Sequence, residues 1–285
     1  IFLSSHALIS SARASNAFVG AKPGDTWSLL LPLTHVAAVN VFVRAFELGT
    51  IPVDLRNYSD AYPRVDFTAI VPTQLFRALN GDQDLLKHLQ GAKKVLVGGA
   101  ALPQALHNQA TAAGITIVTT YGMSETSGGC VYNGEVLDGV EVEVRGGSIF
   151  IRGKILALDL ELVDGWFESN DLGEFVDGKL IVIGRSDDVI ISGGENLSLN
   201  NVEKVLNEHF PALQLAAFSV DDAQWGQSLH IAIVGDADSE SISKVLQSEI
   251  GTFAKPKGVH TMDSLPLLGI GKVDRKRLAQ VIPNE

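Results

Sequence analysis

Residues 115–129 read Ile-Thr-Ile-Val-Thr-Thr-Tyr-Gly-Met-Ser-Glu-Thr-Ser-Gly-Gly, an apolar β-rich run followed by a polar segment that contains glycines. We predict a strand over Ile115–Thr119 and a ligand-binding loop directly after it, because open α/β sheets present ligands at the carboxyl ends of their strands. In that loop Tyr121 can stack on a base, while Ser124 and Thr126 can bond phosphate oxygens. The Glu125 carboxylate can hold a hard cation such as Mg²⁺. The alternative is an ordinary solvated loop, since short glycine-rich loops are common.

The sequence before this stretch alternates short apolar β-rich runs with helical patterns. Such alternation predicts a largely parallel sheet covered by helices. Thr73 and Pro103 are placed as start signals of two of the helices. The expected strands are Trp27–Leu31, Ile51–Asp54, Phe67–Val71, Lys94–Val97 and Ile115–Thr119, and the expected helices are Ala37–Leu48, Thr73–Leu79 and Pro103–Ala113.

The pattern changes after Thr120 and again near Arg185. The first change brings short strands separated by Gly-Gly and Asp-Gly turns, which predict a β-meander or small barrel. The second brings two helices and two strands, a compact α+β unit of normal size for a small domain. The predicted fold class is therefore α/β, with a large domain over residues 1–184 and a small α+β domain over residues 185–285. The added strands are Val140–Val144, Ser148–Arg152, Leu158–Leu162, Lys179–Ile183, Leu215–Val220 and Leu229–Val234, and the added helices are Leu199–His209 and Glu240–Ile250.

Composition restricts the kinds of partner. Of the 285 residues, 46% are hydrophobic and 19% charged, and the formal net charge is −11. This balance fits a globular protein with a large core and disfavours a nucleic-acid binder, which needs clustered Lys and Arg. The most apolar stretch, Trp27–Phe46, is interrupted by polar residues, so no membrane span is expected. A lone Cys130 excludes an intrachain disulfide and fits a reducing, cytoplasmic compartment, and a homo-oligomer is left open.

A second stretch with chemical potential begins at residue 183 with Ile-Gly-Arg-Ser-Asp-Asp and continues to Ser-Gly-Gly-Glu-Asn. An apolar strand, Val189–Ile191, leads into the Gly193-Gly194 turn, where the backbone can approach a ligand or adopt positive φ. The turn precedes a helix that Asn200 or Asn201 could cap. Taken alone, this is an ordinary strand–turn–helix corner.

A third stretch reads Gly269-Ile-Gly-Lys-Val-Asp-Arg-Lys near the end of the chain. Lys272 stands among glycines, and a lysine presented in this way suits the stabilisation of negative charge at a reacting carboxylate and phosphate. The alternative is that Lys272, Arg275, Lys276 and Arg277 form the solvated basic end of the chain.

These stretches, together with Asn170-Asp-Leu-Gly and Val97-Gly-Gly-Ala-Ala-Leu, occur in the order and rough spacing of the acyl-adenylate-forming superfamily. The chain resembles this superfamily over nearly its whole length. Acyl-CoA synthetases, luciferases and peptide-synthetase adenylation domains belong to it. Leu31-Pro-Leu-Thr-His, Val71-Pro-Thr-Gln-Leu and the run from Gly122 to Tyr132 are similar to the o-succinylbenzoate–CoA ligases of menaquinone biosynthesis, particularly the shorter actinobacterial type.

The resemblance implies an ATP-dependent enzyme that joins a carboxylic acid to coenzyme A through an acyl-adenylate, with Mg²⁺. It implies that Glu125 holds the metal and that Lys272 serves adenylation. His35 would contact or close the acyl pocket, although a structural histidine beside Pro32 is the alternative. The remaining implied roles are nucleotide binding by Gly99, Ala100, Ala101, Tyr121, Gly122, Met123, Ser124, Thr126, Asp171 and Arg185; acyl contacts by Thr73, Gln74, Ser127 and Gly128; contact with coenzyme A by Gly193 and Gly194; and a hinge at Asp187.

One departure from the family pattern qualifies these expectations. Family members carry a Ser/Thr/Gly-rich phosphate loop ending in Pro-Lys-Gly shortly before the segment that starts here as Ile1-Phe-Leu-Ser-Ser-His, and this sequence contains none. We therefore expect the large domain to be incomplete at its N-terminus. The open alternatives are a ligase for another aryl or short acid, a peptide-synthetase adenylation domain, and a truncated, non-catalytic nucleotide-binding protein.

Overall fold

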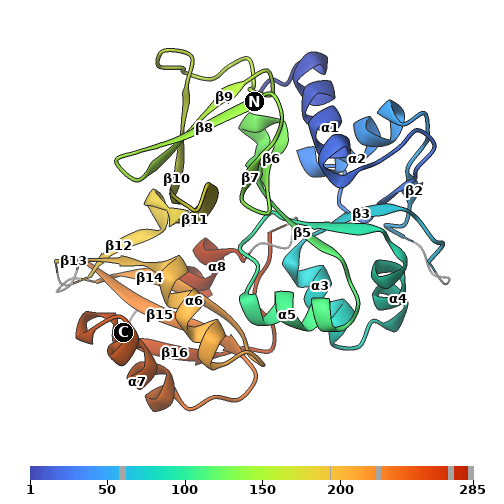
Figure 1. Ribbon diagram of the computed structural model, residues 1–285. Coiled ribbons are helices and arrows are strands. Elements are labelled where there is room, and N and C mark those ends of the chain that lie inside the picture. Colours follow the sequence, from blue (N-terminus) through green and yellow to red (C-terminus); the bar gives the residue numbers. More distant parts are fainter. Residues whose placement is uncertain (58–61, 193, 223–225, 269–272, 282–285) are drawn as a thin grey trace.

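The computed structural model describes residues 1–57, 62–192, 194–222, 226–268 and 273–281. Within these residues the chain forms three β-sheets with helices packed against the first and the third (Figure 1). None of the helices in these ranges has both the length and the apolarity needed to cross a membrane.

The first sheet has seven strands in the order β2-β1-β3-β4-β5-β6-β7. Strands β1 to β5 pair in parallel, and β6 and β7 add antiparallel neighbours, so the prediction of a largely parallel sheet is confirmed. All four residues of β3 are buried, as expected for a strand covered on both faces. The strands are β1 Trp27–Leu29, β2 Val53–Asp54, β3 Phe67–Ile70, β4 Lys94–Val97, β5 Ile117–Met123, β6 Gly128–Tyr132 and β7 Glu135–Val136.

Helices cover both faces of this sheet. Helices α1 and α2 pack on one face, and α3, α4 and α5 pack on the other (Figure 1). Along β4, Val95 and Val97 join the second core while Leu96 joins the first, which is the alternation of side chains expected in a strand. The helices are α1 Ser5–Val19, α2 Val36–Glu47, α3 Pro72–Leu79, α4 Gln83–Gly91 and α5 Gln104–Ala112.

The predicted start of α3 is wrong, while that of α5 is confirmed. Helix α3 begins at Pro72, whose fixed φ suits a first helical position, and Val71 rather than Thr73 precedes it as N-cap. The backbone N–H of Val71 donates to Oε1 of Gln74 at 3.1 Å. Pro103 is the N-cap of α5.

The second sheet is a four-stranded antiparallel meander in the order β11-β10-β9-β8. The predicted strand Leu158–Leu162 is wrong: this segment consists of turns and irregular backbone, and Leu158 is 73% exposed. Strand β10 takes that place in the meander, with Glu, Asn, Asp and Gly in its middle. The strands are β8 Val140–Arg145, β9 Ser148–Gly153, β10 Phe167–Val176 and β11 Lys179–Arg185.

The third sheet has the order β13-β12-β15-β14, and β16 pairs in parallel with β15. Helices α6 and α7 contribute to the core on one face, and α8 contributes to the core on the other. The α+β character predicted for this region is therefore confirmed, while the boundary between residues 184 and 185 stays a prediction. The elements are β12 Val189–Ser192, β13 Glu195–Ser198, α6 Leu199–His209, β14 Gln214–Asp222, β15 Gly226–Val234, α7 Ser239–Glu249, β16 Gly258–Thr261 and α8 Arg275–Val281.

The predicted helix Leu199–His209 is confirmed as α6, but its predicted N-cap is wrong. A strand that was not predicted, β13, pairs with β12 and stands between the predicted turn and this helix. Helix α6 is capped by Ser198, whose Oγ accepts from the backbone N–H of Asn201 at 3.3 Å. Neither Asn200 nor Asn201 is the N-cap, because both already lie inside the helix.

Candidate active site

The carboxyl ends of four neighbouring parallel strands carry predicted site residues. His35 follows β1, Thr73 follows β3, the segment 99–101 follows β4, and Tyr121 lies near the end of β5. Because β1, β3, β4 and β5 are adjacent in the sheet, these positions lie along one edge. This is the edge at which open α/β sheets bind ligands.

The loop after β4 approaches β5 closely. A Cβ at Gly98 would lie 2.1 Å from Oγ1 of Thr120, so only glycine fits there. The next residue, Gly99, adopts φ +84, and Gly99, Ala100 and Ala101 are all exposed. The backbone of this loop, which is implied to bind nucleotide, is therefore accessible beside the end of β5.

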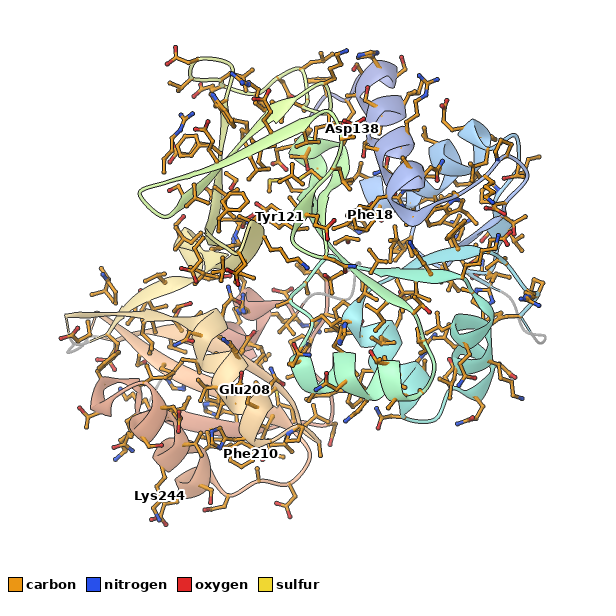
Figure 2. All side chains as sticks on the ribbon, viewed as in Figure 1. Phe18, Tyr121, Asp138, Glu208, Phe210 and Lys244 are labelled. Carbon is orange, nitrogen blue, oxygen red and sulfur yellow. The ribbon has the colours of Figure 1, made fainter. Side chains whose placement is uncertain are left out.

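Tyr121, Asp171 and Arg185 converge from three strands. The Tyr121 hydroxyl donates to Oδ2 of Asp171 at 2.8 Å, and Nη1 of Arg185 lies 3.8 Å from Oδ1 of Asp171. Asp171 on β10 and Arg185 on β11 are register partners, and Asp171 is 9% exposed. Figure 2 shows Tyr121 between the first sheet and strands β10 and β11. The contact brings together three residues that are implied to bind one nucleotide.

The protonation state of Tyr121 follows from this environment. Burial, together with the adjacent Asp171 carboxylate, raises the pKa of the Tyr121 phenol above its usual value. The hydroxyl therefore stays protonated and acts as the donor to Asp171.

The motif around Tyr121 differs from the predicted loop in one respect. Strand β5 continues through Met123, so Tyr121, Gly122 and Met123 lie in the strand and only Ser124–Thr126 form a turn, a single 3₁₀ turn. A Cβ at Gly122 would lie 2.1 Å from the carbonyl oxygen of Gly128. The absence of a side chain at Gly122 thus allows β6 to fold back against the end of β5.

The hydroxyls of Thr126 and Ser127 are engaged by the backbone. Thr126 is fully buried; its hydroxyl donates to Gly128 O at 2.7 Å and accepts from Met123 N–H at 3.0 Å. Ser127 is also buried, with φ +51, and its hydroxyl donates to Ile155 O at 2.7 Å. These bonds stabilise the turn, and the implied phosphate and acyl contacts of the two residues stay predictions.

Glu125 occupies the middle of the same turn and is half-buried. Its carbonyl oxygen accepts from Ala157 N–H at 2.9 Å, which fixes the backbone. Among the described residues, no side chain pairs with its carboxylate. Mg²⁺ in nucleotide sites is commonly held by one or two carboxylates together with phosphate oxygens and water. Glu125 therefore fits the metal-holding role that the sequence implies.

Helix α2 is tied to the turn through Asn40, which the sequence analysis did not single out. Its Nδ2 donates to Ser127 O at 2.7 Å, and a Cβ at Gly128 would lie 2.0 Å from the same nitrogen. His35 is the N-cap of α2 and lies five residues before Asn40, with its ring half-exposed. The helix thus brings His35 to the edge of the sheet that carries Glu125.

Arg44, on the same helix, is a second feature that the sequence did not reveal, since it reads there only as a polar interruption. It is 4% exposed; its Nη2 donates to the Tyr132 hydroxyl at 3.1 Å, and its guanidinium carbon lies 5.1 Å from the Trp27 ring centroid. No carboxylate within the described ranges pairs with it. A buried arginine is usually paired, so this one relies on the aromatic face and the phenol.

The other acyl candidates differ in availability. The amide of Gln74 accepts from Val71 N–H and donates to Leu30 O at 3.1 Å, so it holds the start of α3 against the end of β1. Thr73 is exposed on the first turn of α3. Cys130 is fully buried, and burial raises the pKa of its thiol to about 12, as is typical of a small core side chain.

Predicted residues of the C-terminal region are only partly described. Asp187 lies in the 3₁₀ turn Ser186–Asp188, but its side chain lies outside the described part of the structure. Gly194 is exposed with φ +90 in the turn between β12 and β13. Gly193 and Lys272 lie outside the described residues, so their predicted roles are not tested.

Comparison with protein families decides the affiliation of the chain. A model described as AMP-binding enzyme matches residues 1–185, and one described as AMP-binding enzyme C-terminal domain matches residues 201–272. The chain belongs to the AMP-binding enzyme family. The first match covers the sheet edge described above, and the second ends at Lys272.

Individual relatives of this family agree. A probable 2-succinylbenzoate–CoA ligase of Mycobacterium tuberculosis is 36% identical over 312 residues, which cover 99% of this chain and 81% of the relative. The 2-succinylbenzoate–CoA ligase of Lactococcus lactis is 28% identical over 295 residues, which cover 93% of this chain and 64% of the relative. The chain thus spans less than two thirds of the length of the second relative.

Solved structures of the family have the same fold. A single-residue variant of E. coli MenE with bound OSB-AMS superimposes with a TM-score of 0.84 at 26% identity, covering 98% of this chain and 65% of that one. The o-succinylbenzoate CoA synthetase (MenE) of Bacillus subtilis, in complex with the acyl-adenylate intermediate OSB-AMP, gives a TM-score of 0.81 at 23% identity, covering 99% and 66% of the two chains. The second comparison concerns the fold alone.

Proposed function

We propose that this chain belongs to an ATP-dependent, AMP-forming 2-succinylbenzoate–CoA ligase of menaquinone biosynthesis. The observation that carries the proposal is the convergence of Tyr121, Asp171 and Arg185 at the carboxyl edge of the sheet, where Tyr121 lies on the strand that leads into the Glu125 turn. The relatives named 2-succinylbenzoate–CoA ligase support the choice of acid. A cytoplasmic location, and a small carboxylic acid, ATP and coenzyme A as partners, belong to the same proposal.

Nucleotide binding would use the rigid part of the site. The exposed backbone of residues 99–101 and the ring of Tyr121 would line the adenine. Asp171 is held by the Tyr121 hydroxyl on one oxygen and lies near Arg185 on the other. A carboxylate has about four acceptor positions, so Asp171 retains capacity for the two ribose hydroxyls.

The reaction would proceed in two displacements. A carboxylate oxygen of the acid attacks the α-phosphorus of ATP, an oxygen–phosphorus bond forms, and pyrophosphate leaves. The thiol of coenzyme A then attacks the acyl carbon, loses its proton, and displaces AMP to give the thioester. Because both reactants of the first displacement are anions, added positive charge lowers its barrier.

Two residues would offset the negative charge of the reactants. Glu125, with no partner among the described side chains, would hold Mg²⁺, which supplies charge neutralisation at the phosphates when bound. Lys272 would offset the charge that develops at the reacting carboxylate and α-phosphate. A turn of the C-terminal region about Asp187 would bring Lys272 in for the first displacement and remove it for the second.

The test is ATP–pyrophosphate exchange with the full-length protein, followed by mass detection of the CoA thioester. We expect exchange with 2-succinylbenzoate and little with benzoate or succinate. If exchange occurs only with another acid, 2-succinylbenzoate is not the substrate. If calorimetry shows AMP binding but no acid supports exchange, the proposed catalytic activity is wrong. Glu125→Gln should lower the rate and weaken the response to Mg²⁺, while Glu174→Gln, at an exposed position of β10, is the matched control.

A further inference from the structure

Arg275 begins α8, three residues after Lys272, and its guanidinium reaches three separate elements of the C-terminal region. Its Nε donates to Ala217 O on β14 at 2.9 Å. Its Nη2 donates to Oε1 of Glu203 on α6 at 2.9 Å, and its Nη1 donates to Oδ1 of Asp188 at 3.1 Å. All three nitrogens of the side chain are therefore engaged.

The partners of Arg275 are also bonded to one another. Oε1 of Glu203 accepts from Ala217 N–H at 2.9 Å, and Nδ2 of Asn200 donates to Oδ2 of Asp188 at 3.2 Å. Burial opposes the charge of Arg275, but Glu203 and Asp188 outweigh it and raise the pKa of the guanidinium. Hydrogen bonds in which the donor or the acceptor is ionised, as the donor is here, are about twice as strong as neutral ones.

This network separates Arg275 from the basic residues beside it. Lys276 and Arg277 are exposed, and within the described residues their side chains have no partners, as a solvated basic end would predict. For Arg275 that interpretation is wrong, because its side chain is only 29% exposed and bridges two acids. Arg275 is therefore held by ion pairs, whereas the neighbouring Lys276 and Arg277 are solvated.

The chain immediately before Arg275 is fixed as well. Val273 forms an isolated antiparallel bridge with Leu267, and Asp274 N–H donates to Pro266 O at 2.8 Å. Oδ1 of Asp274 accepts from Arg277 N–H at 3.0 Å, which caps the start of α8. Residues 273–275 are thus held by backbone and side-chain bonds directly after Lys272.

The network also reaches β11, the strand that carries Arg185. Asp188 follows the predicted hinge residue, Asp187. Asn200 packs against Gly184, where a Cβ would lie 2.9 Å from Nδ2 of Asn200. Gly184 precedes Arg185, the register partner of Asp171. Arg275 therefore links the chain after Lys272 to the segment that joins the two regions.

We propose that Arg275 is a positioning residue for the adenylation step, which fixes the chain following Lys272 to the segment that follows Asp187. The inference rests on the proposed function. With this link, a rotation at the hinge is transmitted to residues 273–275 as a rigid movement. Without it, the lysine would be delivered to a broader range of positions, and a misplacement of 1 Å can cost about a hundredfold in rate.

The requirement is for arginine and not for positive charge alone. Its planar fork can donate to Ala217 O, Glu203 and Asp188 at once, whereas a lysine ammonium is a point charge on a flexible stem. We therefore expect Arg275→Lys to behave much like Arg275→Gln. The chain supplies a matched control in Lys276→Gln, which removes an adjacent exposed charge.

The experiment measures the two half-reactions of the full-length protein separately: acyl-AMP formation, and thioester formation from supplied acyl-adenylate. Arg275→Gln should lower kcat for adenylate formation about tenfold to a hundredfold, with the KM for ATP and the thioester half-reaction changed less than about twofold. Lys276→Gln should leave both half-reactions unchanged. Equal losses in the two half-reactions, or no loss in either, would overturn the positioning role.

Two further variants keep the result interpretable. If Arg275→Gln does not fold, Glu203→Gln decides, because it removes the charge and keeps an oxygen for Ala217 N–H and Arg275; the same selective loss, smaller in size, is expected. Lys272→Ala tests the proposed function itself. If Lys272→Ala retains full adenylation, the proposed function fails; if it abolishes adenylation and Arg275→Gln does not reduce it, only the positioning role fails.

Discussion

The edge of the first sheet and the C-terminal region are built in different ways. At the sheet edge, residues far apart in sequence are brought together by backbone pairing, as Asp171 and Arg185 are by the register of β10 and β11. In the C-terminal region, a side-chain network around Arg275 joins elements that have their own core. The first arrangement suits a fixed nucleotide site, and the second suits a body that moves as a unit. Under the proposed function, nucleotide binding and the adenylation chemistry would be assigned to separate parts of the chain.

The largest expected effect tests that separation directly. Lys272→Ala should slow acyl-AMP formation by about a hundredfold or more, the size of losing one preorganised electrostatic contact. Thioester formation from supplied acyl-adenylate should change little, because the lysine has to leave before the thiol enters. Rapid-quench measurement of both half-reactions checks this. Equal losses of rate in the two half-reactions would show that Lys272 does not act specifically in adenylate formation.

A smaller effect is expected at the sheet edge. Asp171→Asn should weaken binding of ATP and AMP by about tenfold or more, since a hydrogen bond to a charged group is worth about 1.5–3 kcal/mol. Calorimetric titration with AMP measures this. Tyr121→Phe, which removes only the 2.8 Å donor to Asp171, should lose less. If Asp171→Asn binds AMP as tightly as the unaltered protein, the ribose assignment is wrong.

A stability measurement examines how α2 is held against the turn. Gly128 has φ +105 and no room for a Cβ, which would lie 2.0 Å from Nδ2 of Asn40. Gly128→Ala should therefore lower the free energy of unfolding by about 1–3 kcal/mol more than the same substitution at a glycine that has positive φ but open space around it. Gly139→Ala, at φ +75 with nothing within 4 Å, is that control. Urea unfolding of the two variants gives the difference, and equal losses would refute the close approach.

The smallest expected effect compares the two regions by pH. Burial lowers the pKa of His88 in the first region and of His230 in the C-terminal region from the usual 6.5. The unfolded chain therefore takes up protons first as the pH falls through about 6.5, and the free energy of unfolding decreases below that pH. Urea unfolding at pH 7.5 and 5.5 measures the decrease.

The matched variants assign that decrease to a region. His88→Gln and His230→Gln should each show a smaller loss between the two pH values than the unaltered protein. An unchanged pH dependence in both variants would mean that other groups govern the acid sensitivity.

The central parallel strands β1, β3 and β4 could be predicted because each is a short, largely buried and mostly apolar run. The bounds of β4, Lys94–Val97, agree with the sequence for this reason. Helix α1 could not be predicted in the same way, because its buried face includes Ser11, Ser15 and Asn16 and shows no apolar period. The prediction for Leu158–Leu162 fails for a different reason: its alternation of leucine with acids is typical of a strand, yet the segment forms turns and irregular backbone, with Leu158 and Leu162 exposed.

The candidate site divides along similar lines. Tyr121, Asp171 and Arg185 lie in local motifs, so the sequence could point to them, and their convergence in the structure agrees with a common ligand. Asn40 carries no such signal, because its role arises only when α2 meets a turn 87 residues further along the chain. Arg275 was visible only as one of several basic residues, since its partners lie 58 to 87 positions before it.

The burial of Cys130 has a practical consequence for watching this protein work. It is the single cysteine of the sequence, and its thiol is buried and protonated at neutral pH, so thiol-reactive dyes should not label it. Cysteines introduced at exposed Asp138 and Lys244, which lie on opposite sides of the molecule in Figure 2, would then be the sole sites of labelling. A pair of fluorophores at these positions would report the distance between the two regions through each turnover, in a chain that needs no prior removal of native thiols.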